Sequence, residues 1–319
     1  MKTTRIASNV IRVTAALGVP CALLITVGSC RRAESTLQGR AFATPKLAVQ
    51  ELAKAVQAGD IGEVMAIFGP DAQVLVDTSD PVTARRNQQV FTVAVAERWR
   101  LEEVGADRNT LVIGHEEWPF PIPLVKDGGE WRYDTAAGKE EILARRIGRN
   151  ELAVIRICRA YVAAQRLYAK YGHDGKPRGI YARAFRSDPA SQNGLFWPAR
   201  KGERRSPLGD LFAAASIDAP TLRRAPTGEP QPFHGYYFRI LTAQGATAPG
   251  GARDYVVNGE MSGGFALIAW PAQFDASGVM TFIVNQDVLV SEKDLGPGTE
   301  AAARAITTYD PDASWTAVR

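Results

Sequence analysis

The feature that most constrains the fold is a segment in the middle of the chain whose apolar residues recur with helical spacing. This segment covers residues 149–169 and has the sequence RNELAVIRICRAYVAAQRLYA. Its apolar side is formed by Leu152, Ile155, Cys158, Tyr161, Val162 and Tyr168. Basic residues with the same spacing occupy the other side, namely Arg156, Arg159, Arg166 and Lys170. The pattern predicts an amphipathic helix that buries one face against a core.

Segments with strand character follow this helix in quick succession, after an expected second helix at residues 206–215. They cover residues 235–243, 254–259, 263–271, 277–285 and 288–296. The turns between them are too short for crossover connections, so we expect antiparallel pairing. Apolar residues occupy both faces of segments 265–270 and 279–284, which predicts central strands covered on both sides. The long helix is the natural cover for one of these faces.

The chain before residue 135 carries clear signals for capped helices. Thr44 and Pro45 predict the start of a helix that ends at Gly59. Asp60 and Glu63 form a capping-box pattern that starts a second helix, which ends at residues 69–70. We expect a third helix at 81–99, followed by strands at 110–114, 121–126 and 130–134.

Together these elements predict an α+β protein with two domains. The first domain is expected at residues 44–135 and the second at 136–319, since domains commonly contain roughly 100 to 150 residues. A short helix near residues 140–146 is expected to end at Gly148, before the amphipathic helix begins. Residues 30–43 are mostly polar and predict a tether, and residues 1–29 predict a signal peptide.

The signal-peptide prediction rests on the order of charged and apolar residues. Lys2, Arg5 and Arg12 are followed by an apolar run that ends at residue 27, and no acidic residue occurs before Glu34. This is the layout of a secretory signal. The run is too short for a membrane span, which needs roughly 20 apolar residues.

Residues 27–30, VGSC, resemble the lipobox of bacterial lipoproteins. The resemblance implies that Cys30 is lipidated and becomes the mature N-terminus, so that a lipid anchor in the membrane is one partner. Arg31 at the next position, where an aspartate would favour retention, implies sorting to the outer membrane and a periplasmic location. The alternative is an ordinary signal cleaved here or after Ala43, with Cys30 incidental and a soluble periplasmic product.

Charge and cysteine content exclude two other classes of protein. Three of the 38 Lys and Arg residues precede Cys30, which leaves 35 against 34 Asp and Glu and a net charge of +1 after processing. Such a balanced charge does not indicate a nucleic-acid partner. After loss of Cys21 and acylation of Cys30, only Cys158 is left, which excludes an intrachain disulfide.

Two or three helices followed by an antiparallel meander resemble the cone-shaped domains of the nuclear-transport-factor-2 (NTF2) and SnoaL-like superfamily. The resemblance implies an isomerase, a cyclase or a plain binding module, so the fold alone gives no activity. An enzyme of this type needs a titratable group inside the cone. The candidates are Asp77, His115, Glu116 and Glu117, and the alternative for the last three is a solvated turn between strands.

Longer stretches carry a more specific resemblance. The segments WPFPIPLVKDGGEWRYDTAAGKEEILARRIGRNEL, HGYYFRILTAQG, VVNGEMSGGFALIAWP, SGVMTFIVNQD and EKDLG resemble the bacterial family catalogued as domain of unknown function 2950. The similarity extends over nearly all of the chain after the signal. It implies an exported bacterial protein and supplies no established activity.

The amphipathic helix and the strands after it also resemble the head of type IV pilins and pseudopilins, in which one long helix covers an antiparallel sheet. The chain departs from that family because no long apolar half-helix and no prepilin cleavage site precede Arg149. We therefore expect a pilin-like head without assembly into fibres.

His234 is the main catalytic candidate, as a general base at the entry to a strand. No Ser or Cys nucleophile with recognisable flanks accompanies it, and GEMSGG does not fit the G-x-S-x-G elbow. A structural histidine at a strand entry is the alternative. His115, His173 and His234 are far apart in sequence, and the loop at Asp174 has basic residues where calcium ligands are needed, so we expect no metal and no cofactor.

Basic and aromatic residues suggest a binding surface. The basic side of the helix, with RKGERR at 200–205 and RR at 223–224, is a candidate surface for anionic lipid or cell-wall polymer, and a solvated face is the alternative. The segments GYYF and NGLFWP are candidate stacking surfaces for glycans, although burial in a sheet also explains them. The sequence therefore predicts a non-catalytic binding or assembly module of the cell envelope, with an unidentified glycan or protein partner. The alternative is an envelope hydrolase or isomerase that uses His234 or a carboxylate of the first domain.

Overall fold

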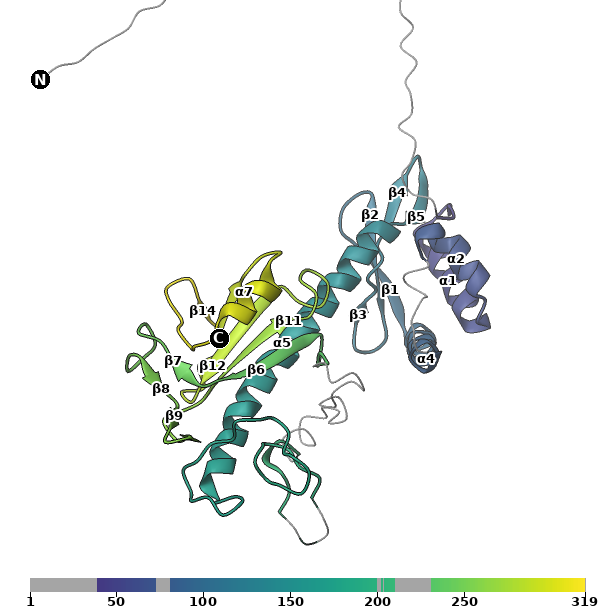
Figure 1. Cartoon of the computed structure of the whole chain (residues 1–319). Helices are drawn as coiled ribbons and strands as arrows, with labels where there is room; N and C mark the ends of the chain where they lie inside the picture. Colours follow the sequence, from purple (N-terminus) through teal and green to yellow (C-terminus); the bar gives the residue numbers. More distant parts are fainter. Residues whose placement is uncertain (1–38, 73–80, 200–201, 203, 210–230, 319) are drawn as a thin grey trace, which may run out of the picture. The chain divides into compact units, whose positions relative to one another are not determined.

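The computed structural model describes residues 39–72, 81–199, 202, 204–209 and 231–318 (Figure 1). It is a mixed α+β fold with open antiparallel sheets and one long helix, as predicted. Residues 39–134 are called the N-terminal region below. Residues 150–318 are called the C-terminal region, and Asp77, residues 223–224 and most of the helix expected at 206–215 lie outside the described residues.

The N-terminal region begins with helices whose ends follow the predicted caps. Helix α1 (Pro45–Ala58) is capped by the hydroxyl of Thr44, which accepts a hydrogen bond from the backbone N–H of Leu47 at 3.2 Å. Gly59 ends the helix in the left-handed conformation, with φ of 68°. Helix α2 (Ile61–Phe68) is followed by a 3-10 turn, η1 (Pro70–Ala72), and by helix α4 (Pro81–Glu97).

The predicted capping box at the start of α2 is only half formed. Asp60 accepts a hydrogen bond from the backbone N–H of Glu63 at 2.9 Å, as expected. The carboxylate of Glu63 does not return to Asp60, because it forms a bidentate ion pair with Arg40. Arg40 lies in the segment 30–43 that was expected to be a tether. The last residues of that segment belong to the fold, since Phe42 is buried and exchanges two backbone hydrogen bonds with Trp131.

An antiparallel sheet completes the N-terminal region. Its strands are β1 (Trp99–Glu103), β2 (Arg108–Ile113), β3 (Trp118–Pro119), β4 (Leu124–Asp127) and β5 (Glu130–Tyr133). The order is β1-β2-β4-β5, with β3 paired beside β2. Strand β1 was not predicted, because its first residue was assigned to the preceding helix. The core between helices and sheet includes Val49, Leu52, Ile67, Phe68, Leu111, Leu124 and Tyr133.

Helix α5 (Thr135–Lys170) is a single helix of 36 residues. The prediction of two helices separated at Gly148 was therefore wrong. A glycine inside a helix costs only about 1 kcal/mol, and this helix packs against other elements at both of its ends. At its start the hydroxyl of Thr135 donates to the carbonyl of Phe68 at 2.6 Å. Toward its end Tyr161 and Tyr168 are buried in the core of the C-terminal region.

The main sheet of the C-terminal region has the order β14-β13-β12-β11-β6 and is antiparallel throughout. Its strands are β6 (Tyr236–Leu241), β11 (Ala266–Pro271), β12 (Met280–Asn285), β13 (Ser291–Asp294) and β14 (Thr316–Ala317). Two small hairpins lie beside it. They pair β7 (Ala243–Gln244) with β8 (Arg253–Asp254), and β9 (Val256–Val257) with β10 (Glu260–Met261).

Both faces of this sheet are covered, as the apolar strands predicted. Tyr236 and Arg239 of β6 point to opposite faces because side chains alternate along a strand. The Tyr236 hydroxyl lies 3.4 Å from a carboxylate oxygen of Glu151 on α5. Arg239 donates to the carbonyl of Ala303 at 2.9 Å. Ala303 belongs to α7 (Thr299–Ala305), a helix that was not predicted and that lies against the face opposite α5 (Figure 1).

The buried face of α5 differs in detail from the predicted one. Cys158 is buried and Arg159 is exposed, in agreement with the prediction. Leu152 is 55% exposed, so its assignment to the core face was wrong. Ile155 is half-buried and packs against the edge of the core. The face is centred on Val154, Tyr161 and Gln165, all buried, and at 100° per residue Leu152 falls on the far side.

Candidate functional site

The candidate residues of the N-terminal region lie on the surface. His115, Glu116 and Glu117 are exposed in the turn between β2 and β3. The carboxylate of Glu117 forms an ion pair with Arg98 at 2.8 Å. Residues in this position face solvent rather than the interior of a cone, and the solvated-turn interpretation fits them.

His234 lies immediately before β6 and is exposed. Its ring packs edge-on against Phe233, with 4.5 Å between centroids, and its backbone φ is 47°. Desolvation of the covered part of the ring lowers the pKa of His234 below its usual value.

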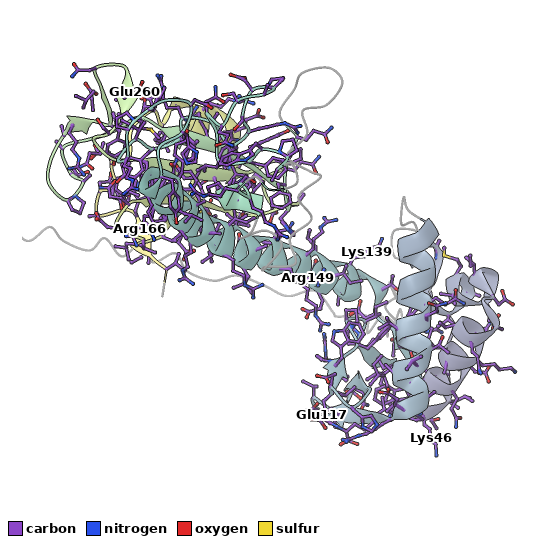
Figure 2. The ribbon with its side chains drawn as sticks, turned by 90° about the horizontal axis from the view of Figure 1, so that it is seen from below. Lys46, Glu117, Lys139, Arg149, Arg166 and Glu260 are labelled. Atoms are coloured by element: carbon purple, nitrogen blue, oxygen red, sulfur yellow. The ribbon has the colours of Figure 1, made fainter. Side chains whose placement is uncertain are left out.

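The four basic residues of the helix are exposed, as expected for its polar face. Arg149 and Arg166 mark α5 in Figure 2, where Arg166 lies on the part that packs against the C-terminal sheet. Arg166 donates to the carbonyl of Gln286 at 2.7 Å, which ties the helix to the turn after β12. Lys170 lies over the ring of Tyr171, with 5.7 Å from Nζ to the centroid. Only Lys170 of this group is near the site described next.

A folded loop structure begins where α5 ends, and Gln165 fixes it to the helix. Gln165 is fully buried and its amide exchanges two hydrogen bonds with the backbone of Ala182, at 2.8 and 2.9 Å. The amide nitrogen also donates to the hydroxyl of Tyr161 at 3.0 Å. Buried polar groups satisfied in this way hold one arrangement of helix and loop.

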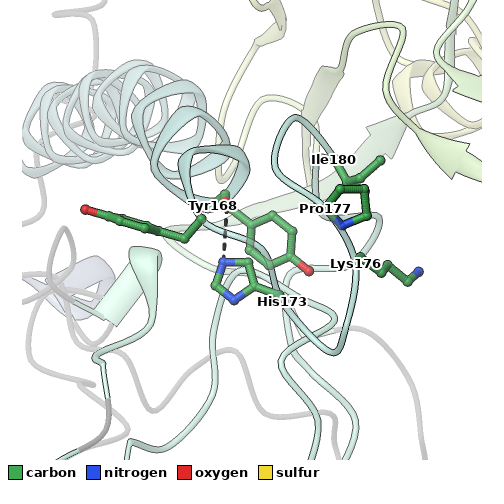
Figure 3. Close-up of a pocket in the computed structure, with 6 residues that line it drawn as sticks. Tyr168, His173, Lys176, Pro177 and Ile180 are labelled. Atoms are coloured by element: carbon green, nitrogen blue, oxygen red, sulfur yellow. Dashed lines mark hydrogen bonds between the residues drawn. The ribbon is translucent and has the colours of Figure 1, made fainter.

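His173 forms the centre of this loop structure. Its ring stacks on Tyr168 at 4.2 Å and meets the edge of Trp197 at 5.4 Å. Nε2 lies 3.1 Å from the carbonyl oxygen of Tyr168, and Figure 3 shows this hydrogen bond beside Lys176 and Ile180. Because a carbonyl only accepts, Nε2 carries the proton. Nδ1 lies 3.2 Å from the side chain of Gln192, so both ring nitrogens are engaged.

Asp174 fastens the same loop to the segment that follows. Its carboxylate accepts hydrogen bonds from the hydroxyl of Ser191 at 2.6 Å and from the backbone N–H of Gln192 at 2.9 Å. The sequence predicted a turn here rather than a calcium loop. In the described part of the chain, no three His, Cys, Asp or Glu side chains are grouped so that they can hold a metal ion.

Residues 184–199 fold back on themselves and contain the buried Trp197. The backbone of Phe196 is hydrogen-bonded to Phe185 and Ser187. This approach requires Gly194, because a Cβ at that position would lie 2.5 Å from the carbonyl carbon of Arg186. The indole N–H of Trp197 donates to the backbone carbonyl of Arg204 at 3.2 Å. Trp197 thereby positions the arginine pair that follows it.

These elements border an open hollow with a volume of about 220 Å³. Its lining residues come from the end of α5 and from the two loop segments, and they are Leu167, Tyr171, His173, Trp197, Arg204, Arg205 and Pro207. The guanidinium of Arg204 stacks over the ring of Tyr171, with 3.7 Å from its central carbon to the centroid. We call this the Tyr171–Arg204 pocket. A narrower hollow, lined by Tyr168, Tyr171, His173, Lys176, Pro177 and Ile180, adjoins it (Figure 3).

The lining of the pocket combines cationic and aromatic side chains. Among the residues that the structure describes, it includes two guanidinium groups and aromatic rings, and no described Ser, Cys, Asp or Glu contributes to it. The one histidine in the lining donates from Nε2 to the carbonyl of Tyr168 and packs between two rings, so it is not presented as a base. Guanidinium groups bind carboxylate and phosphate oxygens through paired N–H donors. The pocket is suited to an anionic group.

The sequence contained the parts of this pocket separately. NGLFWP was noted for its aromatic residues and RKGERR for its charge, and the structure shows that Trp197 from the first contacts Arg204 from the second. The two segments are only a few residues apart in the sequence, and this proximity was the signal that could have indicated a shared site. Tyr171 and His173 were missed as site residues because the YGHDG segment predicts only a turn.

The fold defines an α+β protein with two hydrophobic cores and open antiparallel sheets. The chain matches the model of the family described as "Protein of unknown function (DUF2950)" over residues 39–318. It therefore belongs to this family, in agreement with the resemblance seen in the sequence. No curated protein and no solved structure matches it. None of the helices in the described residues combines the length and apolar character needed to cross a membrane.

Proposed function

We propose that the chain is an exported, lipid-anchored protein of the bacterial envelope that acts as a non-catalytic binding module. The signal-like residues 1–29 and the lipobox-like residues 27–30 support the export and anchoring part of this proposal. Cys30 is the expected site of lipidation, with the periplasm and the outer membrane as the expected location. The binding part rests on the C-terminal region.

The observation that carries the binding proposal is the Tyr171–Arg204 pocket. It is a hollow of about 220 Å³ at the end of α5 with two arginines in its lining, and the indole of Trp197 donates to the backbone carbonyl of one of them, Arg204. Preformed hollows with a few convergent polar groups are typical of ligand sites. The described candidates for catalysis do not converge in this way, since His234 and the carboxylates near His115 are exposed and lie on separate elements.

We also propose that each region uses its fold as a scaffold. The N-terminal region, with helices against an antiparallel sheet, is compatible with an NTF2-like module that binds rather than isomerises. The C-terminal region is compatible with a pilin-like head, because α5 covers one face of an antiparallel sheet. The first turns of α5 pack against the N-terminal region, through Thr135 and Phe68, which argues against pilin-type fibre assembly through that part of the helix.

A binding assay against isolated envelope polymers tests the main proposal. Polysaccharide and peptidoglycan fractions should retain the purified chain, and Arg204→Ala should release it. Arg156→Ala is the matched control, since Arg156 is an equally exposed arginine on α5 away from the pocket. A hydrolase and isomerase screen with wild type and His234→Ala tests the alternative. Turnover that His234→Ala abolishes would show that the protein is an enzyme.

The anchoring proposal has its own test. Cells that express the wild-type chain should incorporate labelled palmitate into it, and Cys30→Ser should prevent incorporation and release the protein from the membrane fraction. A wild-type product that is soluble and unlabelled would leave the ordinary-signal alternative in place.

A further inference from the structure

We propose that the exposed face of α5 in the C-terminal region is a contact surface for a membrane that contains anionic phospholipids. This face is a row of residues that alternate in steps of three and four positions, and all of them are exposed. They are Arg149, Leu152, Arg156, Arg159, Ala163, Arg166 and Lys170. We call this row the α5 stripe. It is a different surface from the pocket to which the proposed function assigns binding.

The stripe is a nearly straight line of cations. Its mean step of 3.5 residues is close to the 3.6 residues of one helical turn, so the row follows the helix axis over about 32 Å. Arg149 and Arg166 mark most of this length in Figure 2. The helix is held in this rotation because Val154 and Tyr161 are buried on its other side. The stripe therefore stays on the surface.

The charge of the stripe is not balanced along its own helix. Residues 149–170 contain one acidic residue, Glu151, and its side chain is turned toward the sheet. The carboxylate accepts hydrogen bonds from the backbone N–H groups of Val279 at 2.9 Å and Met280 at 3.0 Å. The five cations of the stripe form no ion pair with any residue that the structure describes.

Ordinary structural roles explain only the end of the stripe. The partial negative charge of the helix C-terminus favours Lys170 in the last turn, and Arg166 donates to the carbonyl of Gln286. Arg156 and Arg159 lie about three turns or more before the end, where the effect of the helix dipole has fallen off. As like charges three residues apart they also destabilise the helix. A bound anionic partner offsets this repulsion.

The uncharged residues of the stripe favour a lipid surface over a glycan. Leu152 is 55% exposed and lies between Arg149 and Arg156, and Leu167, 36% exposed, lies next to Arg166. Aliphatic side chains in these positions can enter the headgroup layer while the guanidinium groups contact phosphate oxygens. No residue of the stripe is aromatic, so it has no ring on which a sugar can stack.

The proposed lipid anchor adds to this attraction. Eight residues, 31–38, separate Cys30 from the first described residue, Gly39. A chain of that length extends to at most about 28 Å, so an anchored protein would remain close to the bilayer. Tethering raises the effective concentration of the stripe at the membrane. The contribution of the anchor depends on the anchoring proposal, whereas the charge of the stripe does not.

Vesicle co-sedimentation with the full chain carrying Cys30→Ser measures the stripe separately, because this variant has no lipid of its own. The vesicles contain phosphatidylcholine with or without phosphatidylglycerol. We expect at least tenfold tighter binding to the anionic vesicles, and weaker binding at high salt, because salt screens exposed charges. Arg156→Ala combined with Arg159→Ala should weaken binding at least tenfold, since each cation near an anionic surface contributes about fivefold.

Two matched variants test whether charge at this position is responsible. Arg156→Lys combined with Arg159→Lys should bind nearly as the parent chain does, because attraction to a charged surface depends on charge more than on the shape of the cation. Arg108→Ala combined with Arg178→Ala removes the same charge from two exposed arginines outside the stripe and should leave binding unchanged. If the alanine pair on the stripe lowers the urea midpoint, Arg149→Glu replaces it in the same comparison.

Equal binding to anionic and neutral vesicles would overturn the proposal. An equal loss in the Arg108 and Arg178 variant would do so too, because net charge rather than the stripe would then be responsible. Retention on an anionic polysaccharide through Arg156 and Arg159, without binding to vesicles, would also overturn it and identify a polymer as the partner. The palmitate test of Cys30 and the polymer test of Arg204 have separate readouts, so failure of either leaves the vesicle result unchanged.

Discussion

Each region of the molecule contains a fully buried tyrosine, and the hydroxyl groups of these two residues differ in their hydrogen bonding. Tyr133 in the N-terminal region packs against Phe68 and Phe120, and its hydroxyl has no hydrogen-bond partner among the described residues. Tyr161 in the C-terminal region donates to the carbonyl of Ala266 at 3.2 Å and accepts from Gln165. Burial raises the pKa of both phenols well above the usual value.

The difference concerns these two side chains, since the C-terminal region also contains Trp270 Nε1 and Thr281 Oγ1 buried without a partner in the part of the chain that the structure describes. In the N-terminal region the buried tyrosine behaves as another aromatic ring, and contact area supplies the stability. In the C-terminal region the buried polar groups connect α5, the sheet and the loop at Ala182. These bonds set the rotation of the helix and hold the loop at Ala182 against it.

Two carboxylates extend the comparison. Glu63 in the N-terminal region has a lowered pKa, because it accepts hydrogen bonds from Arg40. Glu292 in the C-terminal region has a raised pKa, because burial and the nearby Glu151 disfavour its charged form. Ionisation of Glu63 thus stabilises the folded N-terminal region, whereas ionisation of Glu292 destabilises the folded C-terminal region.

Gln165→Leu should give the largest effect. The substitution keeps the volume roughly the same but leaves the backbone N–H and carbonyl of Ala182 buried without their partner. We expect a loss of roughly 3 kcal/mol in the free energy of unfolding, since each orphaned group costs about 1 to 3 kcal/mol. Urea denaturation followed by circular dichroism measures it.

The control for this change is Arg159→Ala, an exposed position on the same helix. It should stay within about 0.5 kcal/mol of wild type. Equal midpoints for Gln165→Leu and wild type would mean that the polar network does not hold the C-terminal region.

Tyr161→Phe should have the next largest effect. The variant keeps the ring, which packs on Phe265 with 5.7 Å between centroids, and removes only the hydroxyl. The carbonyl of Ala266 and one bond of Gln165 lose their partner, so we expect a loss of about 1 to 2 kcal/mol. Thermal unfolding compares it with wild type, and an unchanged midpoint would contradict the role assigned to this hydroxyl.

The elements that the sequence predicted best are those with local signals. Thr44, Gly59 and Asp60 act on their own neighbours, so the limits of α1 and α2 could be predicted without knowledge of the tertiary fold. The central strands were equally clear because both their faces are apolar. Helix α7 was missed because its seven residues are mostly alanine, and their position depends on Arg239 of a distant strand.

The pocket depends on contacts that sequence patterns do not encode. Gln165 looks like any polar helix residue, yet its fully buried amide fixes a loop 17 residues away. The stack of Arg204 on Tyr171 joins two segments that are separated by more than thirty positions. Charge and aromatic content predicted the type of chemistry, and only the fold determined which residues meet.

Glu292→Gln should have a smaller effect that depends on pH. The folded-state pKa of Glu292 is raised, so its contribution to stability is fully present below the unfolded pKa of about 4.3. This contribution is lost as pH rises through the folded pKa, because the folded state then has to ionise the group. The variant should therefore match wild type in acid and be more stable near neutral pH. Urea midpoints measured from pH 4 to 8 give the difference.

Glu63→Gln is the matched variant in the other region and should give the opposite sign. The pKa of Glu63 is lowered, so its contribution is present above the unfolded pKa and is lost as pH falls through the folded pKa. Glu63→Gln should be less stable than wild type near neutral pH and equal to it in acid. The same sign for both variants would remove the contrast between the two carboxylates.

Tyr133→Phe should have the smallest effect, and it tests the comparison most directly. The hydroxyl of Tyr133 is buried without a partner among the described residues, so its removal relieves a desolvation cost instead of breaking a bond. The ring keeps its contact with Phe68, at 5.0 Å between centroids. We expect stability equal to wild type or higher by up to about 1 kcal/mol, against a clear loss for Tyr161→Phe. Parallel urea titrations of the two variants measure the contrast. A loss in Tyr133→Phe as large as that in Tyr161→Phe would show that the Tyr133 hydroxyl has a bonding partner, and the contrast between the two tyrosines would then be gone.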